Sequence, residues 1–403
     1  MEQSARLWNK NFIILFLMKA ASGMATMMVV PLIAKYVVSI GGTLEMAALV
    51  ATLMSWAALA VRPLSGPLSD RLNRKTILLV SMVVIAGCCV AYCFTKNMAV
   101  IIVLRIIHGI AFAFFGVSSL AFSAMFVPRD KMGEGLGYIS MGDLVASAVG
   151  PGLGISLLGK FDFNTVYLLA AGILGVSSAL LLMIPYVKPQ QGPEMKAFSL
   201  RETFALKNLI AKEAIIFACM MGLFSAGNSL MSTYSAIIGE ERNIPNISVF
   251  YTAYAVAALI VRPFSGKLLD KRGLTLIVIP AYFIAAASNF VIGIAMTGGL
   301  FALAGVLKAV GQGTGSPSIQ AECVRRVGQE KAGVIGSTCY IGQDIGNALT
   351  PILAAPIVNS FGYGTLFKGF SILLVTVGLG LYALELFLEK RRAEKKAAAA
   401  AEE

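Results

Sequence analysis

The chain has 403 residues, of which 57% are hydrophobic and only 13% are charged. A soluble domain carries about 25% charged residues, so this composition excludes an ordinary water-soluble protein and indicates a surface that largely faces lipid. The net charge of +12 does not indicate a nucleic-acid partner, because the basic residues are not gathered on one face or in a binding motif.

Twelve apolar stretches follow one another along the chain, separated by short polar joins. A membrane-spanning helix needs about 20 mostly apolar residues, and each stretch meets this length. The first one runs to about Val38, which is too long for a signal peptide. The predicted helices are residues 11–38, 44–66, 76–95, 98–125, 133–158, 164–187, 212–238, 247–268, 274–296, 299–322, 332–358 and 363–388.

The twelve helices form two sets of six, which predicts an all-α membrane protein made of two pseudo-symmetric six-helix bundles. The longest polar stretch lies between the sets. In it, Ser199 and Glu202 have the spacing of a capping box, which predicts a short helix on the membrane surface. The predicted segments are an N-terminal bundle (1–187), a cytoplasmic linker with this interfacial helix (188–211), a C-terminal bundle (212–388) and a charged cytoplasmic tail (389–403).

The loop lysines and arginines predict the orientation of the chain. With a cytoplasmic N-terminus, twenty-three of them fall in cytoplasmic segments, and only Lys35, Lys96, Lys160 and Arg242 fall outside. Cytoplasmic loops of membrane proteins carry this excess of positive charge. We therefore expect both termini in the cytoplasm, and the short loops are typical of a protein of the bacterial cytoplasmic membrane.

An internal repeat supports the two-bundle architecture. The sequence Val-Arg-Pro-Leu-Ser-Gly at 61–66 recurs as Val-Arg-Pro-Phe-Ser-Gly at 261–266, and an aspartate follows each copy, Asp70 and Asp270. Parallel repeats of six helices, with a substrate site between them, are a known plan for transporters. Further matches are Gly142-Asp143 with Gly342 and Asp344, and Pro151 with Pro351.

The segment from Gly66 to Lys75 reads Gly-Pro-Leu-Ser-Asp-Arg-Leu-Asn-Arg-Lys. It resembles the helix 2–3 loop signature of the major facilitator superfamily, which reads Gly-x-Leu-Ala-Asp-Arg-x-Gly-Arg-Lys. Asn73 stands at the glycine position, and because asparagine tolerates a left-handed backbone, we expect the turn to be kept. The resemblance covers essentially the whole chain. Weaker matches are Leu104-Arg105 with Gly109, which resembles the helix 4 motif, and Gly150-Pro151-Gly152 with Gly154, which resembles the helix 5 motif of the antiporters.

The resemblance implies a twelve-helix transporter that works by alternating access, with a conformational latch on its cytoplasmic side. The latch residues are Gly66, Asp70, Arg71, Arg74 and Lys75, together with Asp270 of the second copy. The alternative is a solvated loop whose basic residues only reflect its position on the cytoplasmic side of the membrane.

Proline at 151 removes a backbone donor inside its helix. The glycines beside it permit either bending or tight packing. An exchange role for this segment and packing alone therefore both remain open.

Charged residues inside the apolar stretches are costly in lipid and face a cavity or one another. Lys19 and Asp143 lie at similar depths, roughly 12 and 15 Å from the inner ends of their helices, so we expect them to pair. Lys308 and Asp344 match less well in depth. We therefore expect Asp344 to bind a proton more readily, and it is the first candidate for proton coupling; a structural ion pair with Lys308 is the alternative.

Three polar residues and one further cation complete the candidate site. Arg105 is a fifth intramembrane charge, and His108, the only histidine, follows it by three residues; it is either a packed side chain or a proton relay. Asn228 and Gln343 lie mid-membrane, where they face substrate or bond neighbouring helices. The cations Lys19, Arg105 and Lys308 favour an anionic or zwitterionic substrate.

The sequence shows no phosphate-binding loop, no metal-ligand pattern and no nucleophile–base arrangement. We therefore expect no enzymatic activity, no cofactor and no metal. The expected function is secondary active transport by a monomer, in which drugs or small metabolites leave in exchange for protons. One alternative is proton-coupled uptake of a sugar, an organic acid or an amino-acid-like solute. An alternative of another class is a membrane sensor that does not transport.

Overall fold

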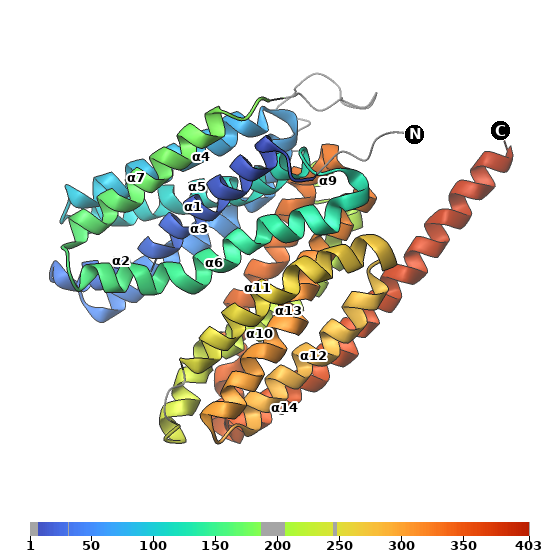
Figure 1. The fold of residues 1–403 in the computed structure, drawn as a ribbon. Coiled ribbons are helices and arrows are strands. Elements are labelled where there is room, and N and C mark those ends of the chain that lie inside the picture. The colour runs from blue at the N-terminus through green and yellow to red at the C-terminus, as the bar shows by residue number, and fades with distance from the viewer. Residues whose placement is uncertain (1–6, 31, 187–205, 245–247, 403) are drawn as a thin grey trace. The chain divides into compact units, whose positions relative to one another are not determined.

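The computed structural model describes residues 7–30, 32–186, 206–244 and 248–402. The described chain is built of helices (Figure 1). They are α1 (Lys10–Val29), α2 (Leu32–Ser39), α3 (Leu44–Arg71), α4 (Arg74–Cys93), α5 (Met98–Ala124), η1 (Arg129–Lys131), α6 (Met132–Leu158), α7 (Phe163–Leu182), α9 (Leu206–Leu209), η2 (Lys212–Ala214), α10 (Ile215–Glu241), α11 (Val249–Arg272), α12 (Thr275–Ile294), α13 (Gly298–Val327), η3 (Gln329–Lys331) and α14 (Ala332–Glu402).

These helices account for twelve membrane passes. Within the described residues, 10 segments are long and apolar enough to cross a membrane. One of them, Gln329–Arg392, has 64 residues and provides two passes, because the backbone of α14 is non-helical at Gly362 (φ 76°, ψ 168°). The remaining pass is α13, which is 30 residues long but more polar. The predicted twelve-helix architecture is confirmed.

Several predicted boundaries differ from the observed ones. The first predicted helix is observed as two, α1 and α2. The predicted charged tail is helical, because α14 continues past residue 388 to Glu402. The predicted surface helix with Ser199 and Glu202 lies outside the described residues, apart from the short α9 at its end.

The chain forms two compact units. Unit 1 comprises Met1–Lys212, Arg262–Arg272 and Gln320–Ile341, and unit 2 comprises Glu213–Val261, Gly273–Ile319 and Gly342–Glu403. Unit 1 therefore holds short segments of α11, α13 and α14 as well as α1 to α7. The division into bundles of residues 1–187 and 212–388 stays a prediction.

Small residues allow the helices of each unit to pack closely. In unit 1, α6 packs on α1, and α5 packs on α3 and α4 (Figure 1). A Cβ built on Gly109 of α5 would lie 2.4 Å from the Met54 carbonyl oxygen of α3. In unit 2, a Cβ built on Gly342 of α14 would lie 2.1 Å from the Ala218 carbonyl oxygen of α10. Such contacts between small residues bring helix backbones together in membranes.

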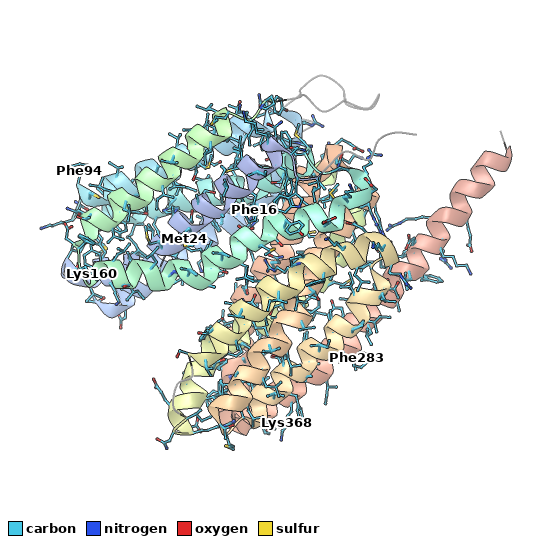
Figure 2. All side chains as sticks on the ribbon, viewed as in Figure 1. Phe16, Met24, Phe94, Lys160, Phe283 and Lys368 are labelled. Carbon is cyan, nitrogen blue, oxygen red and sulfur yellow. The ribbon has the colours of Figure 1, made fainter. Side chains whose placement is uncertain are left out.

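Large apolar side chains cover much of the outer surface, as expected for a protein in lipid. Phe94 is 82% exposed and Phe283 is 51% exposed (Figure 2). Many hydroxyl side chains inside the helices bond to their own backbone; for example, the Thr26 hydroxyl donates to the Ser22 carbonyl oxygen at 2.9 Å. This arrangement is required where no water is present to accept the bond.

Five helices of the described chain begin at a residue whose side chain caps the first turn, and Asn73 of α4 is one of these residues. Asn9, Thr43, Asn97 and Asp162 each accept a hydrogen bond from a backbone N–H two or three residues ahead. Helices α6, α10 and α12 begin without such a bond, and the N-cap residue of α6 is Lys131. The first N–H groups of a helix have no intrahelical partner, so those of α6 need an acceptor from elsewhere in the chain.

Candidate functional site

The carboxylate of Asp70, in the last turn of α3, caps the N-terminus of α14. Its two oxygens accept hydrogen bonds from the backbone N–H groups of Gly333 at 2.7 Å and Val334 at 2.8 Å. A carboxylate at this position satisfies two orphan donors and interacts favourably with the positive end of the helix dipole. Because the Asp70 side chain is only 6% exposed, water competes little for these bonds.

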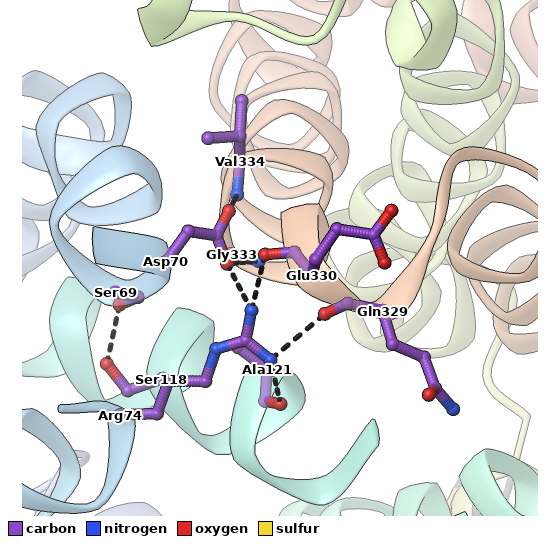
Figure 3. Close-up of polar contacts among 9 residues, drawn as sticks. All are labelled: Ser69, Asp70, Arg74, Ser118, Ala121, Gln329, Glu330, Gly333 and Val334. Atoms are coloured by element: carbon purple, nitrogen blue, oxygen red, sulfur yellow. Dashed lines mark hydrogen bonds and ion pairs between the residues drawn. The ribbon is translucent and has the colours of Figure 1, made fainter. Parts of the chain in front are cut away.

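The Arg74 side chain encloses this cap (Figure 3). Its Nη2 donates to Asp70 Oδ1 at 2.8 Å and to the Glu330 carbonyl oxygen at 2.6 Å. Its Nη1 donates to the carbonyl oxygens of Gln329 at 3.0 Å and Ala121 at 3.1 Å. One guanidinium group thus ties the end of α3 and the helix α5 to the turn that precedes α14.

The second copy of the motif forms the reciprocal cap. The carboxylate of Asp270, in α11, accepts hydrogen bonds from the backbone N–H groups of Gly133 and Glu134, both at 2.8 Å. These are the N–H groups of α6 that lack a local acceptor. In addition, the Lys267 ammonium group lies 3.6 Å from the Glu134 carboxylate.

The two caps are related by a shift of 200 residues, since Asp70 pairs with 333 and 334 while Asp270 pairs with 133 and 134. Each sequence half therefore supplies an acceptor to the other half and receives one from it. The two caps differ in one respect. Leu274 occupies the position equivalent to Arg74, so the second cap lacks the arginine that encloses the first.

Glycine is required where each cap forms. A Cβ built on Gly66 would lie 2.8 Å from Val334 Cα, and one built on Gly133 would lie 2.7 Å from the Gly266 carbonyl oxygen. Side chains of any other residue would hold the aspartate away from the helix end. The close helix approach predicted for Gly66 is confirmed.

Other residues of the predicted latch have different contacts. Lys75 donates to the carbonyl oxygens of Leu182 and Ile184 at 3.0 and 2.7 Å, where it satisfies the end of α7. Arg71 is half-buried at the end of α3. The expected left-handed turn at Asn73 is wrong: Asn73 has φ −70° and ψ 107° and caps α4. Asparagine is favoured at this position because its side chain accepts from an orphan N–H.

A second reciprocal pair of contacts, which was not predicted, lies further along the same helices. The Arg62 guanidinium lies 4.6 Å from the centre of the Tyr340 ring. The Arg262 Nη1 donates to the carbonyl oxygen of Ser140, the residue equivalent to Tyr340. The arginine within the repeated Val-Arg-Pro sequence was the available signal, because it lies inside an apolar stretch.

Lys19 and Asp143 form the expected ion pair, with 3.1 Å between Lys19 Nζ and Asp143 Oδ1. The Lys19 side chain is 6% exposed and that of Asp143 is 48% exposed, so the cation is the desolvated partner. The Lys19 ammonium also lies 4.7 Å from the centre of the Phe115 ring. Close packing of α6 on α1 positions the pair, since a Cβ on Gly142 would lie 3.2 Å from Ala20 Cα.

Arg105 and His108 have partners other than this ion pair. The Arg105 guanidinium donates to the carbonyl oxygens of Val50 at 3.1 Å and Ala51 at 3.3 Å, both on α3. The His108 ring stacks on Tyr92 with 6.4 Å between ring centres. Both Arg105 and His108 are fully buried, and a role of either in proton coupling stays a prediction.

The equivalence of Asp143 and Asp344 is wrong by one residue. In the register that the two caps define, Asp143 corresponds to Gln343, and Asp344 corresponds to Leu144. One residue turns the side chain by about 100° around the helix. Asp344 is half-buried and has interaction partners of its own, so its role as the coupling carboxylate stays a prediction.

Lys308 is 4% exposed and lies in unit 2. In the part of the chain that the structure describes, its ammonium group lies over two aromatic rings, 4.7 Å from the centre of Tyr254 and 5.3 Å from the centre of Phe250. These are cation–π contacts, and the ion pair with Asp344 considered above stays a prediction.

The other candidate residues are on helices of both units. Asn228 of α10 is half-buried, and Gln343 of α14 donates to the Ser316 hydroxyl at 3.4 Å. In the helix 5 segment, Cβ atoms on Gly150 and Gly154 would lie 2.7 and 2.3 Å from atoms of α1. These two glycines therefore serve close packing around Pro151, while Gly152 has open space beside it. An exchange role for the segment stays a prediction.

Residues 15–349 match the sequence model of the Major Facilitator Superfamily. The chain belongs to this superfamily. This MFS chain is 27% identical over 387 residues to the "Multidrug resistance protein MdtG" of Salmonella paratyphi C, covering 93% of this chain and 94% of that protein. The protein of the same name from Escherichia fergusonii is 26% identical over 370 residues, covering 89% and 90%.

Solved MFS structures have the same fold at low sequence identity. The human organic anion transporter MFSD10 (TETRAN) has a TM-score of 0.73 and 16% identity, over 94% of this chain and 98% of that one. The Escherichia coli fucose:proton symporter FucP has a TM-score of 0.77 and 13% identity, over 94% and 99%. The MFS chain is thus a secondary transporter that crosses the membrane many times, as the sequence predicts.

Proposed function

We propose that this protein exports drugs or small metabolites in exchange for protons across the bacterial cytoplasmic membrane, with both termini in the cytoplasm. The relatives named for multidrug resistance support the outward direction. The distribution of loop lysines and arginines supports the orientation. The Lys19–Asp143 pair supplies a desolvated cation and a partly exposed carboxylate, the charges that an ion-coupled carrier needs within its helices.

The reciprocal caps are the observation that carries this proposal. Alternating access requires contacts that close one side of the carrier and break once in each cycle. A carboxylate on a helix N-terminus suits this task, because the same backbone N–H groups can be hydrated when the contact opens. The Asp70 and Asp270 caps both join one sequence half to the other, so opening them separates the halves without unfolding a helix.

Transport in inverted membrane vesicles tests direction and coupling together. An imposed pH gradient, acidic inside the inverted vesicle, should drive cationic, neutral or anionic dyes inward. Collapse of the gradient by an ionophore should stop accumulation. Accumulation that is unchanged by the ionophore would contradict proton coupling, and accumulation only in right-side-out vesicles would contradict export.

A second candidate, uptake of an anionic solute with protons, is favoured by Lys308. Its buried ammonium group lies against aromatic rings and can accept an anionic group of an aromatic solute. 2-Naphthoate and neutral 2-naphthamide form a matched pair of probes. Lys308→Met should remove any preference for naphthoate, while Lys368→Met, at an exposed lysine of the same unit (Figure 2), should not. Equal binding of both probes by the native protein would contradict this candidate.

A further inference from the structure

Four polar side chains meet in the interior of unit 1, away from the caps and the Lys19–Asp143 pair. They are Tyr92 of α4, Arg105 and His108 of α5, and Tyr167 of α7, and each is 0% exposed. The Tyr92 ring centre lies 6.4 Å from that of His108 and 5.5 Å from that of Tyr167. The Arg105 side chain lies within hydrogen-bonding reach of the Tyr92 hydroxyl and within electrostatic range of His108 and Tyr167, so the four groups form one cluster.

The cluster contains more hydrogen-bonding capacity than its protein neighbours satisfy. Arg105 Nε and Nη2 reach backbone carbonyls of α3. Among the described residues, however, Arg105 Nη1, both ring nitrogens of His108, and the hydroxyl groups of Tyr92 and Tyr167 have no well-formed hydrogen bond. Neutral imidazole needs one donor and one acceptor, and a phenol donates once and accepts. Buried polar groups are almost always hydrogen-bonded, either to protein or to ordered water.

A neighbouring tyrosine shows that aromatic packing alone does not cause this shortage. The Tyr36 ring lies 5.7 Å from the Tyr167 ring, yet its hydroxyl reaches the carbonyl oxygens of Tyr92 at 3.0 Å and Thr95 at 2.7 Å. A ring packed beside this cluster can therefore keep a fully bonded hydroxyl.

The chemistry of these groups identifies the ligand. The cluster offers donors, from Arg105 and the two phenols, and acceptors, from the imidazole and the phenol oxygens. A cation would be repelled by the guanidinium, and an anion would use only the donors. Water both donates and accepts, and a buried water typically makes about three hydrogen bonds to groups of this kind.

We propose that Tyr92, Arg105, His108 and Tyr167 enclose an internal water site within unit 1. Water there completes the hydrogen bonds of all four side chains and solvates the Arg105 guanidinium, which otherwise contacts backbone carbonyls of α3 and the Tyr92 side chain. The site explains how a cation and a histidine are accommodated at full burial inside an apolar bundle. It does not depend on the direction of transport or on proton coupling.

The test compares two buried tyrosines in the purified full-length protein. Tyr167→Phe removes one hydroxyl at nearly constant shape. If water binds that hydroxyl, Tyr167→Phe should lower Tm by about 2 °C, because a satisfied bond is lost. Tyr282→Phe is the matched control, since the buried Tyr282 hydroxyl donates to the Met220 carbonyl oxygen at 3.1 Å and should show a similar loss. A Tyr167→Phe variant with unchanged or higher Tm, beside a destabilised Tyr282→Phe variant, overturns the proposal.

Two further measurements make the result independent of one variant. Tyr92→Phe and Tyr167→Phe should show non-additive shifts in Tm when combined, because they share bound water; additive shifts argue against a shared site. An experimental structure of the native protein should show density about 2.7–3.2 Å from the Tyr167 hydroxyl. An anomalous signal there after exchange of chloride for bromide would assign an anion and overturn the proposal, as would a site without density.

Discussion

Replacing Asp70 by asparagine tests the first cap most directly. The asparagine oxygen can still accept from the Gly333 N–H group, but its amide N–H₂ group then faces the Val334 N–H group, where a donor meets a donor. Arg74 also loses the carboxylate that lies 2.8 Å from its Nη2. Hydrogen bonds to charged groups contribute about 1.5–3 kcal/mol each. We therefore expect Asp70→Asn to destabilise the capped state by about 3 kcal/mol, a shift of roughly 100-fold in its equilibrium with the open state.

Amide hydrogen exchange measures this shift at the bonds concerned. The exchange rate of a peptide that contains Gly333 and Val334 should rise steeply in Asp70→Asn, while membrane insertion stays intact and transport slows. The matched control is Asp270→Asn, read out on a peptide that contains Gly133 and Glu134. Asp270→Asn removes one hydrogen bond to the backbone, and no arginine bond is lost because the second cap has no arginine equivalent to Arg74. The equilibrium between its capped and open states should therefore shift about tenfold, or by about 1.5 kcal/mol. Unchanged exchange at residues 333 and 334 together with normal transport would refute the reasoning, as would a larger effect of the control.

Three further outcomes follow from other contacts. Asp143→Asn should reduce the amount of folded protein by leaving the buried Lys19 cation without its partner, at a cost of about 2 kcal/mol; the added change Lys19→Met should restore yield in size-exclusion profiles, and failure to do so would contradict the pairing. Asp344→Asn should abolish accumulation driven by a pH gradient but retain substrate exchange in proteoliposomes, and continued accumulation would place coupling elsewhere. Gly133→Ala should disrupt the second cap, because the new Cβ would lie 2.7 Å from the Gly266 carbonyl oxygen, at about 1–3 kcal/mol; wild-type exchange rates at residue 134 would contradict this.

The helices could be predicted well because long apolar stretches have few alternatives in a membrane. Their ends could not, since hydropathy reports where a helix leaves the lipid, while backbone hydrogen bonding continues beyond it. Helix α3 therefore extends to Arg71 and not to residue 66, and α11 extends to Arg272 and not to residue 268. The aspartates of both caps lie in these added turns, so the site depends on the part of each helix that hydropathy leaves out.

The acceptors of the site were visible in the sequence, and their partners were not. A repeated Gly-x-x-x-Asp pattern marks Asp70 and Asp270, but nothing local marks the N–H groups of α14 and α6, because every residue other than proline has one. The alignment of the two halves could not be predicted from the sequence either. Asp143 and Asp344 are both charged residues near the middle of their helices, so the sequence alone suggests that they are equivalent. The observed pairing of Asp70 with Val334 and of Asp270 with Glu134 shows that they differ by one position.

The unequal strength of the two caps has a kinetic consequence. Two caps of equal strength would open in random order, so the transport cycles would be divided between two routes. Here the Asp70 cap carries the additional bonds of Arg74, while Leu274 contributes none to the Asp270 cap. If both caps open in each transport cycle, the cap held by fewer bonds has the lower barrier to opening. We therefore expect the Asp270 cap to open before the Asp70 cap, so that a single arginine sets the order of opening in a chain with two copies of the motif.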